Sequence, residues 1–299
     1  MPASPRSPLM LIGAFLALYL VWGSTYLFIR IGVESWPPLL MAGVRFVIAG
    51  SILYTFLRLR GAPNPSWRQW RAAGCIGVLL LSCGNGGVTV AEHAGVASGV
   101  AALAVATVPL FTLVFGLLRG QRNTRLEWAG IVLGLVGIGL LNLGSNLQAS
   151  PFGAALILFA AASWAFGSVW SRSLPLPEGA MASAAEMLIG GAVLLLGSAL
   201  SGERMTQWPT LAGWGALAYL VCFGSILAFS AYMYLLKHVR PAAATSYAYV
   251  NPAVAVLLGI LFADEHIGAV ECLAMAVIIG AVVLIGVPQW RKAQEAPTG

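Results

Sequence analysis

The sequence predicts an all-α integral membrane protein in which ten transmembrane helices form two inverted repeats of five. Three observations predict this fold: the composition, ten long apolar segments, and a duplicated pattern of tryptophan and proline. Of the 299 residues, 59% are hydrophobic and 9% are charged, and the mean hydropathy is +0.87. About a quarter of the residues in a soluble domain are charged, so this chain has too little polar surface for a soluble globule.

Ten apolar segments are each long enough, at about 20 residues, to cross a hydrocarbon core of about 30 Å as a helix. The first is too long for the apolar core of a signal peptide, and no small-residue cleavage site follows it, so we expect a retained helix. The segments cover residues 9–29, 39–57, 72–91, 96–118, 128–143, 152–170, 181–200, 211–236, 242–263 and 268–287.

A pattern in the first half of the chain recurs in the second half. Trp164 follows Trp22 by 142 positions (164 − 22), and Pro252 follows Pro109 by 143 (252 − 109). Five spans per repeat is an odd number, so the second repeat enters the bilayer from the opposite side and the repeats are inverted. The predicted parts are a first repeat at 9–148, a second repeat at 151–288, and cytoplasmic tails at 1–8 and 289–299.

The net charge of +6 follows this topology. With the amino terminus inside, thirteen lysines and arginines fall in inner loops and ends, whereas two, Arg30 and Arg204, fall in outer loops. Such an asymmetry over short loops obeys the positive-inside rule, so we expect both termini in the cytoplasm. The basic charge then sets the orientation and is not a nucleic-acid patch. The expected partners are the lipid bilayer and a small-molecule substrate.

Inverted repeats favour a secondary active transporter, because they place a substrate site near the bilayer midplane at their interface. Neither lysine, Lys237 or Lys292, follows the glycine spacing of a Walker A motif, so ATP is not the expected energy source. No metal-site or hydrolase spacing occurs either, so we expect no metal, no cofactor and no enzyme activity. A channel and an intramembrane enzyme are the alternatives from other classes.

Two mid-span prolines, Pro109 and Pro252, occupy matching positions in the two halves. Each lacks a backbone N–H and frees a carbonyl four residues earlier. A free carbonyl in a bilayer is tolerated only beside protein or water, so we predict that both prolines line the central cavity; an ordinary kink is the alternative. Near Pro252, Tyr249 and Asn251 are the preferred ligand contacts.

Polar and aromatic side chains supply further candidates for the cavity. Ser82, Asn85, Thr89 and His93 recur at steps of three and four residues and so share one helical face. We assign Asn85 and Thr89 to the cavity wall, with interhelical hydrogen bonding as the alternative role of the stripe. Aromatic rings can stack on a flat or cationic solute, although an interfacial belt is the competing interpretation. The aromatic candidates are Trp22, Trp164, Phe229 and Tyr232, with Ser168 grouped beside them.

Two charged residues lie within predicted spans, Arg45 in the second and Glu186 in the seventh. A central arginine costs about 3 kcal/mol on insertion scales, so each charge needs a partner or a wet cavity. Counted from the ends of their spans, they are about 13 Å apart along the bilayer normal, which argues against a direct ion pair. We assign them to opposite gates, with Glu186 as the candidate for proton coupling.

The fifth segment carries Gly130 and Gly134 in a G-x-x-x-G spacing, with Gly137 one turn further on. This spacing allows close helix approach. Packing inside the bundle is the favoured interpretation, and a homodimer interface is the alternative.

Several stretches resemble the EamA family of the drug/metabolite transporter superfamily, and its YedA-type bacterial inner-membrane branch in particular. The resemblance implies a ten-helix inverted repeat whose cavity is lined by helices one, three, four, six, eight and nine. It also implies an inner-membrane exporter of amino acids, other metabolites or toxic organic compounds, often driven by proton exchange. An exporter of multiple drugs or organic cations is the main alternative. The stretches are YLVWGSTYLFIRIGVESWPPLLMAGVRF, GNGGVTVAEH, VATVPLF, SWAFGSVW and AYMYLLKHVRPAAATSYAYVNPAVAVLLG.

Overall fold

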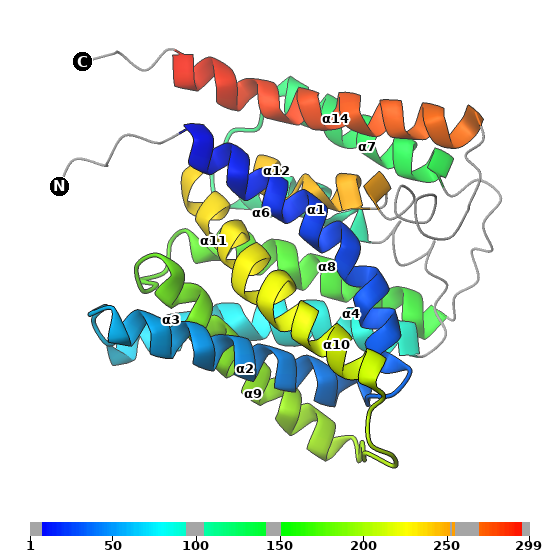
Figure 1. The fold of residues 1–299 in the computed structure, drawn as a ribbon. Helices are drawn as coiled ribbons and strands as arrows, with labels where there is room; N and C mark the ends of the chain where they lie inside the picture. Colours follow the sequence, from blue (N-terminus) through cyan, green and yellow to red (C-terminus); the bar gives the residue numbers. More distant parts are fainter. Residues whose placement is uncertain (1–7, 94–104, 142–150, 252, 255–268, 295–299) are drawn as a thin grey trace.

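A computed structural model describes residues 8–93, 105–141, 151–251, 253–254 and 269–294. Within these residues all regular secondary structure is helical, and the helices form one layered bundle (Figure 1). In the first half the helices are α1 (Pro8–Val33), α2 (Pro38–Leu59), α3 (Trp67–Gly77), η1 (Val78–Gly86), α4 (Gly87–His93), α6 (Val108–Leu118) and α7 (Arg125–Leu141). In the second half they are α8 (Pro151–Ser171), α9 (Ala180–Leu200), α10 (Leu211–Tyr219), η2 (Leu220–Leu227), α11 (Ala228–His238), α12 (Pro241–Ala244) and α14 (Ala269–Gln294).

Six helical stretches in the described part are long and apolar enough to cross a membrane. They correspond to the first, second, third, sixth, seventh and eighth predicted spans. The other four predicted spans fall partly outside the described residues, so the count of ten stays a prediction. The six stretches are Leu9–Val33, Pro38–Leu59, Trp67–Ala91, Phe152–Ser171, Ala180–Leu200 and Leu211–His238.

The third and eighth spans each contain a π-helical stretch at the same point. In both, an α-helix leads into the π-helix, η1 or η2, and a second α-helix follows. The η2 stretch begins 142 positions after η1 (220 − 78), which is the spacing between Trp22 and Trp164. A π-helix bonds each N–H to the fifth carbonyl before it, and such stretches occur often at functional sites.

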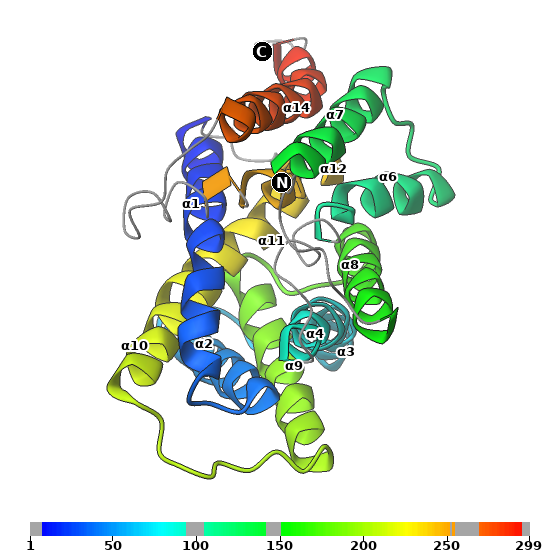
Figure 2. The ribbon, with the colours of Figure 1, turned by 90° about the vertical axis from the view of Figure 1, so that its right-hand side faces the viewer.

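Glycines allow two helix pairs to approach at backbone distance. A Cβ at Gly43 or Gly50 of α2 would come within about 3 Å of Leu195 or of the backbone at Ala184 and Leu188 of α9. Gly130 and Gly137 of α7 face α14 in the same way, where Gly130 meets Ala281 and Ile285 and Gly137 meets Ile278. In Figure 2 the α2 and α9 pair and the α7 and α14 pair lie at opposite edges of the bundle. The G-x-x-x-G spacing of α7 is therefore used inside the chain, as the favoured interpretation expected.

Carboxylates and hydroxyls cap several helix ends. Glu203, beyond the end of α9, accepts hydrogen bonds from the backbone N–H groups of Leu39 and Leu40 at 3.1 and 2.9 Å. An anion at a helix N-terminus satisfies otherwise unpaired donors and interacts favourably with the helix dipole. Ser66 and Gln69 form a capping box at the start of α3. These contacts fix where the spans begin.

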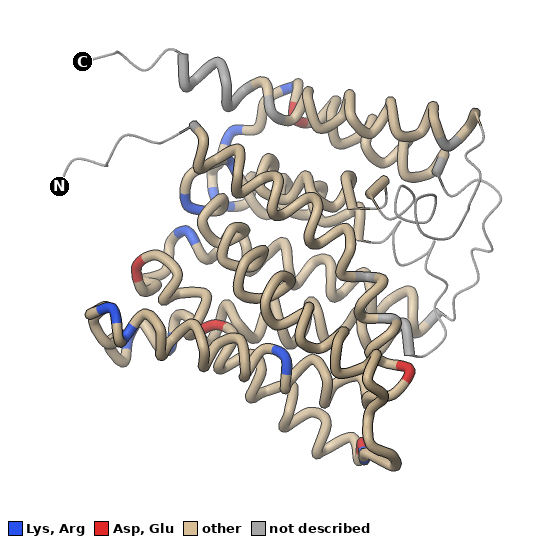
Figure 3. Tube along the Cα trace, viewed as in Figure 1, with Lys and Arg blue, Asp and Glu red and all other residues tan. Residues whose placement is uncertain are grey.

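The start of α1 and the end of α14 lie at the same end of the bundle (Figure 1). Most of the described lysines and arginines gather toward that end (Figure 3), whereas Arg45 is buried within the bundle. An even number of spans produces this arrangement. The cytoplasmic orientation of the two termini stays a prediction from the charge pattern.

Gly77→Ala tests a third approach of this kind, between α3 and α9. The added Cβ would lie 2.3 Å from the backbone oxygen of Glu186, so α3 and α9 must separate. Overpacking of this kind costs about 1–3 kcal/mol. We expect a lower thermal unfolding midpoint of the purified protein in detergent. Gly215→Ala is the matched control, because a Cβ at Gly215 meets nothing within 4 Å; equal midpoints for the two variants would contradict the predicted contact.

Candidate functional site

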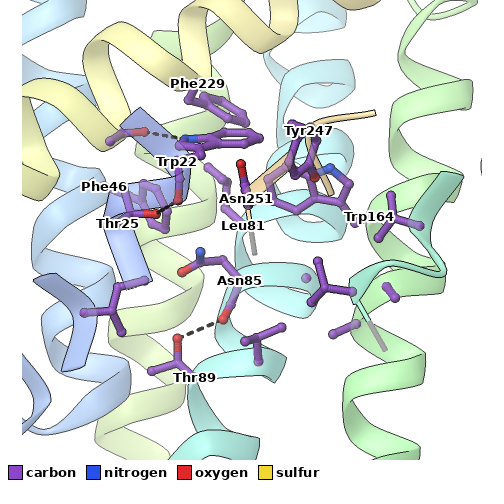
Figure 4. Close-up of a pocket in the computed structure, with 18 of the residues that line it drawn as sticks. Trp22, Thr25, Phe46, Leu81, Asn85, Thr89, Trp164, Phe229, Tyr247 and Asn251 are labelled. Carbon is purple, nitrogen blue, oxygen red and sulfur yellow. Dashed lines mark hydrogen bonds between the residues drawn. The ribbon is translucent and has the colours of Figure 1, made fainter. Parts of the chain in front are cut away.

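A cavity lies among helices from both halves of the chain (Figure 4). The cavity has a volume of about 100 Å³. Its wall is mostly apolar and aromatic, with one arginine and a few amide and hydroxyl groups. The lining residues are Trp22, Thr25, Ile29, Arg45, Phe46, Leu81, Gly84, Asn85, Val88, Thr89, Val105, Val108, Ala160, Ala161, Trp164, Gly224, Phe229, Tyr247 and Asn251.

The two tryptophans at matching positions of the halves meet in this cavity. The rings of Trp22 and Trp164 contact edge to face, with centroids 5.6 Å apart, a favoured geometry for aromatic pairs. Trp22 donates its indole N–H to the carbonyl of Gly224 in η2 at 3.0 Å, and its ring packs against Tyr247 with centroids 4.8 Å apart. One tryptophan of the first half is thus fixed by the second half.

A hydrogen-bond network holds Trp164 from behind the cavity wall. Its indole N–H donates to the hydroxyl of Tyr232 at 3.0 Å, and that hydroxyl lies 2.5 Å from the hydroxyl of Ser168. Ser168 and Tyr232 are fully buried and do not line the cavity. Both predicted residues therefore position Trp164, whereas Phe229 lines the cavity itself.

Asn85 and Asn251 provide the amide groups of the wall, and both lie between the Trp22 ring and Thr89 in Figure 4. The Asn251 side-chain oxygen is buried and has no hydrogen-bond partner within the described residues. The hydroxyl of Thr89 is occupied, since it donates to the Asn85 backbone carbonyl at 2.9 Å. The amides therefore offer the polar contacts that a solute could use.

The polar stripe predicted for the third span is divided in the structure. Ser82 points away from the cavity and donates to the backbone carbonyl of Gly190 in α9 at 2.9 Å. The cause is the π-helical turn of η1, which changes the angular step between Ser82 and Asn85. Asn85 and Thr89 line the cavity, while the side chain of His93 is outside the described part.

Arg45 enters the cavity wall from α2. Its side chain is buried, its Nε donates to the Ser225 hydroxyl of η2 at 2.8 Å, and its guanidinium carbon lies 4.8 Å from the centroid of the Phe46 ring. The one ion pair among the described residues joins Arg240 to Glu127. No carboxylate of the described chain therefore neutralises Arg45.

Glu186 is fully buried in α9, outside the cavity wall. Neither carboxylate oxygen has a hydrogen-bond partner in the described part of the chain. The α9 backbone at Ala184 and Leu188 meets Gly50 of α2, five residues beyond Arg45, which corresponds to about 7.5 Å along the helix. Along the helix axes, Arg45 and Glu186 are thus closer than the separation of about 13 Å expected from the ends of their spans. They nevertheless form no ion pair.

The prediction for Pro109 needs correction, whereas that for Pro252 stays a prediction. Pro109 does not sit in the middle of a helix, because α6 begins at Val108 after a turn and the proline occupies its first turn. No helical N–H is needed there. Pro109 is buried and does not line the cavity, although Val105, whose carbonyl it was expected to free, does. Pro252 lies outside the described residues.

Tyr249 also does not line the cavity, contrary to the prediction. Its ring packs against Gly134 of α7, and its hydroxyl donates to the carbonyl of Ile131 at 3.5 Å. The turn at 245–246 changes which face of the following helix looks inward, so Tyr247 lines the cavity instead. Thr25 and Phe46 also line the cavity but were not among the predicted residues. Their positions in the sequence, one helical turn after Trp22 and directly after Arg45, could have identified them.

Contacts between the halves close the bundle at the end that carries the start of α1. Arg240 of the segment before α12 binds Glu127 at the start of α7. Nearer the cavity, the hydroxyls of Tyr19 and Ser246 lie 2.7 Å apart. Arg172 at the same end donates a hydrogen bond to the Val239 carbonyl at 2.9 Å. Partial burial, and secondly the positive charge of Arg240, lower the pKa of Arg172.

Comparisons with known proteins give the same picture of the chain. It is 57% identical to the uncharacterized inner membrane transporter YedA of Escherichia coli K12, over 94% of this chain and 92% of that protein. It is 23% identical to a probable amino-acid metabolite efflux pump of the same strain, over 93% and 95% of the two chains. One crystal structure, 22% identical, shares the fold with a TM-score of 0.76 and covers 95% of this chain and 99% of its own.

The sequence model of the EamA-like transporter family matches this chain twice, at residues 9–143 and at residues 151–287. The two matches together cover nearly the whole sequence, and the apolar spans and central cavity fit a membrane transporter. The chain belongs to the EamA-like transporter family.

Proposed function

We propose that this protein is a secondary active transporter that exports small organic metabolites, amino acids or related aromatic compounds, across the bacterial inner membrane. The observation that carries the proposal is the cavity between the halves, in which Trp22 and Trp164 meet. A mostly apolar pocket with a few convergent polar groups is the usual form of a small-molecule site. The names of the YedA relative and of the amino-acid metabolite efflux pump support the location and the substrate class.

The two halves act as inverted repeats in this proposal, residues 9–148 and 151–288, with both termini in the cytoplasm. The two family matches and the π-helices at equal spacing support it. Transport then proceeds by alternating access, with the halves rocking about the central site. The Arg240–Glu127 pair and the Tyr19–Ser246 contact join the halves at the cytoplasmic end, so both must break for that end to open.

Proton coupling is assigned to Glu186. A buried carboxylate without a hydrogen-bond partner is costly in its charged form, so its protonation state responds to conformation and water access. Glu186 belongs to α9, which contacts α11, and α11 carries Tyr232, the residue that holds Trp164 in the cavity wall. Protonation of Glu186 can therefore bias the position of a cavity residue without direct contact with the solute.

Counterflow in proteoliposomes tests the transport proposal. Vesicles loaded with unlabelled solute are diluted into labelled solute, over a panel of amino acids, nucleosides and organic cations, with and without a pH gradient. We expect saturable, trans-accelerated uptake of at least one metabolite. Trp164→Ala should reduce it at least about ten-fold, because stacking energy of about 1 kcal/mol and the shape of the site are lost.

Trp67→Ala is the matched control for that variant, because Trp67 is 74% exposed and outside the cavity wall; we expect unchanged counterflow. Flux that never saturates would indicate a channel. Chemical conversion of a solute by the purified protein would indicate an enzyme. Counterflow restricted to organic cations would favour the alternative exporter class.

Glu186→Gln separates coupling from solute binding. Without a titratable group at this position, transport driven by a pH gradient should fall at least about ten-fold, while counterflow at equal pH continues near the wild-type rate. Glu178→Gln serves as the control, since Glu178 is exposed in the loop before α9. If Glu186→Gln retains gradient-driven transport, Glu186 is not the coupling carboxylate.

A further inference from the structure

We propose that Arg45 is the anchor of an anion subsite in the cavity, which binds the carboxylate of an aromatic or apolar organic acid. This inference rests on the proposed function and names the chemical class of the transported solute. It also gives Arg45 a role different from the gate expected from its depth in the sequence.

The described wall of the cavity carries a positive charge without a counter-charge. Arg45 is 4% exposed, and no carboxylate in the described part of the chain pairs with it. A buried cation without a counter-charge is costly in a membrane, and such residues mark ligand or ion pathways. An anionic solute that enters the cavity would supply the missing charge, whereas an organic cation would be repelled.

The Arg45 guanidinium is held in a fixed orientation by residues around it. Ser225 occupies its Nε at 2.8 Å, and Phe46 supports it from one side with the ring centroid 4.8 Å away. Gly224 allows the close approach, since a Cβ there would lie 2.8 Å from an Arg45 Nη atom. With Nε engaged, a carboxylate would meet the Nη edge, and the planar fork of arginine suits two parallel hydrogen bonds to carboxylate oxygens.

The rest of the cavity wall offers one free polar acceptor and several aromatic rings. The unpartnered Asn251 oxygen can accept a hydrogen bond from an N–H or O–H group of the solute. Trp22, Trp164 and Phe229 offer ring faces and edges to an apolar body. The cavity therefore pairs one charged anchor with an aromatic wall, which fits an amphipathic acid.

The test compares three probes with one ring and different charges: phenylacetate, phenylacetamide and phenethylammonium. Binding to the wild-type protein in detergent is measured from the rise of the thermal unfolding midpoint with probe concentration. We expect phenylacetate to bind at least about ten-fold more tightly than the other two. Equal binding of the acid and the amide, or no binding of the acid, overturns the proposal without any variant.

Arg45→Gln should bring the acid and the amide within about two-fold of each other, and Arg45→Lys should recover only part of the preference. Arg68→Gln is the charge-matched control on the exposed start of α3, where we expect no change. If Arg45→Gln does not fold, Ser225→Ala leaves the charge in place and removes the contact that orients it, and should reduce the preference several-fold. A preference unchanged in the folded variants assigns Arg45 a purely structural bridge between α2 and η2 and overturns the proposal.

The same proteoliposomes distinguish failure of this inference from failure of the proposed function. Saturable counterflow with no advantage for carboxylates contradicts the anion subsite alone. Tight binding of phenylacetate without counterflow of any solute contradicts the transport proposal and leaves the subsite intact.

Discussion

The constraint on which this structure depends is that a bilayer offers no hydrogen-bond partners, so each polar group within it must be satisfied by the protein or by water in a cavity. Most polar side chains of the described spans obey it through local bonds, as when Thr112 and Ser171 donate to carbonyls three or four residues earlier. Within the described residues the exceptions include Arg45, Glu186 and Asn251, each buried with an unneutralised charge or an unpartnered oxygen. The buried hydroxyls of Ser183 in α9 and Ser230 in α11 also lack a hydrogen-bond partner there. Arg45 and Asn251 line the cavity, where an unsatisfied polar group is costly in structure and available to a solute.

Packing follows from the same solvent. Apolar surface gains little by moving from lipid to protein, so close contact between backbones must hold the helices together. Glycines of α2, α7 and α9 provide that contact at the two edges of the bundle. With the edges fixed, the interior can be occupied by large rings instead of a filled aliphatic core. Trp22, Trp164 and Tyr232 form such a cluster, in which hydrogen bonds to Gly224 and Ser168 set the orientation of the rings.

Much of this could be predicted from the sequence, and the failures share a cause. The lengths of the apolar segments predicted the membrane-spanning helices. The matching positions of Trp22 and Trp164 in the two halves indicated two residues that meet in space. Predictions of which residue faces the cavity assumed regular α-helices. They failed at Pro109 and Tyr249, next to the start of α6 and the turn at 245–246. The single polar face predicted for the third span is likewise divided, at the π-helix η1. These irregularities depend on tertiary contacts, such as the fit of Tyr249 against Gly134, which no local pattern encodes.

The central claim is that a water-accessible chamber lies between the two halves, and cysteine labelling tests it most directly. In a background without Cys75, Cys83, Cys222 and Cys272, Val88→Cys places a thiol in the cavity wall, whereas Val136→Cys places one on the outer surface of α7, where Val136 is 51% exposed. Only a thiolate reacts with a membrane-impermeant maleimide, so labelling requires water. The account predicts labelling at position 88, slowed by bound solute, and none at position 136; equal inertness of the two cysteines in membranes would contradict it.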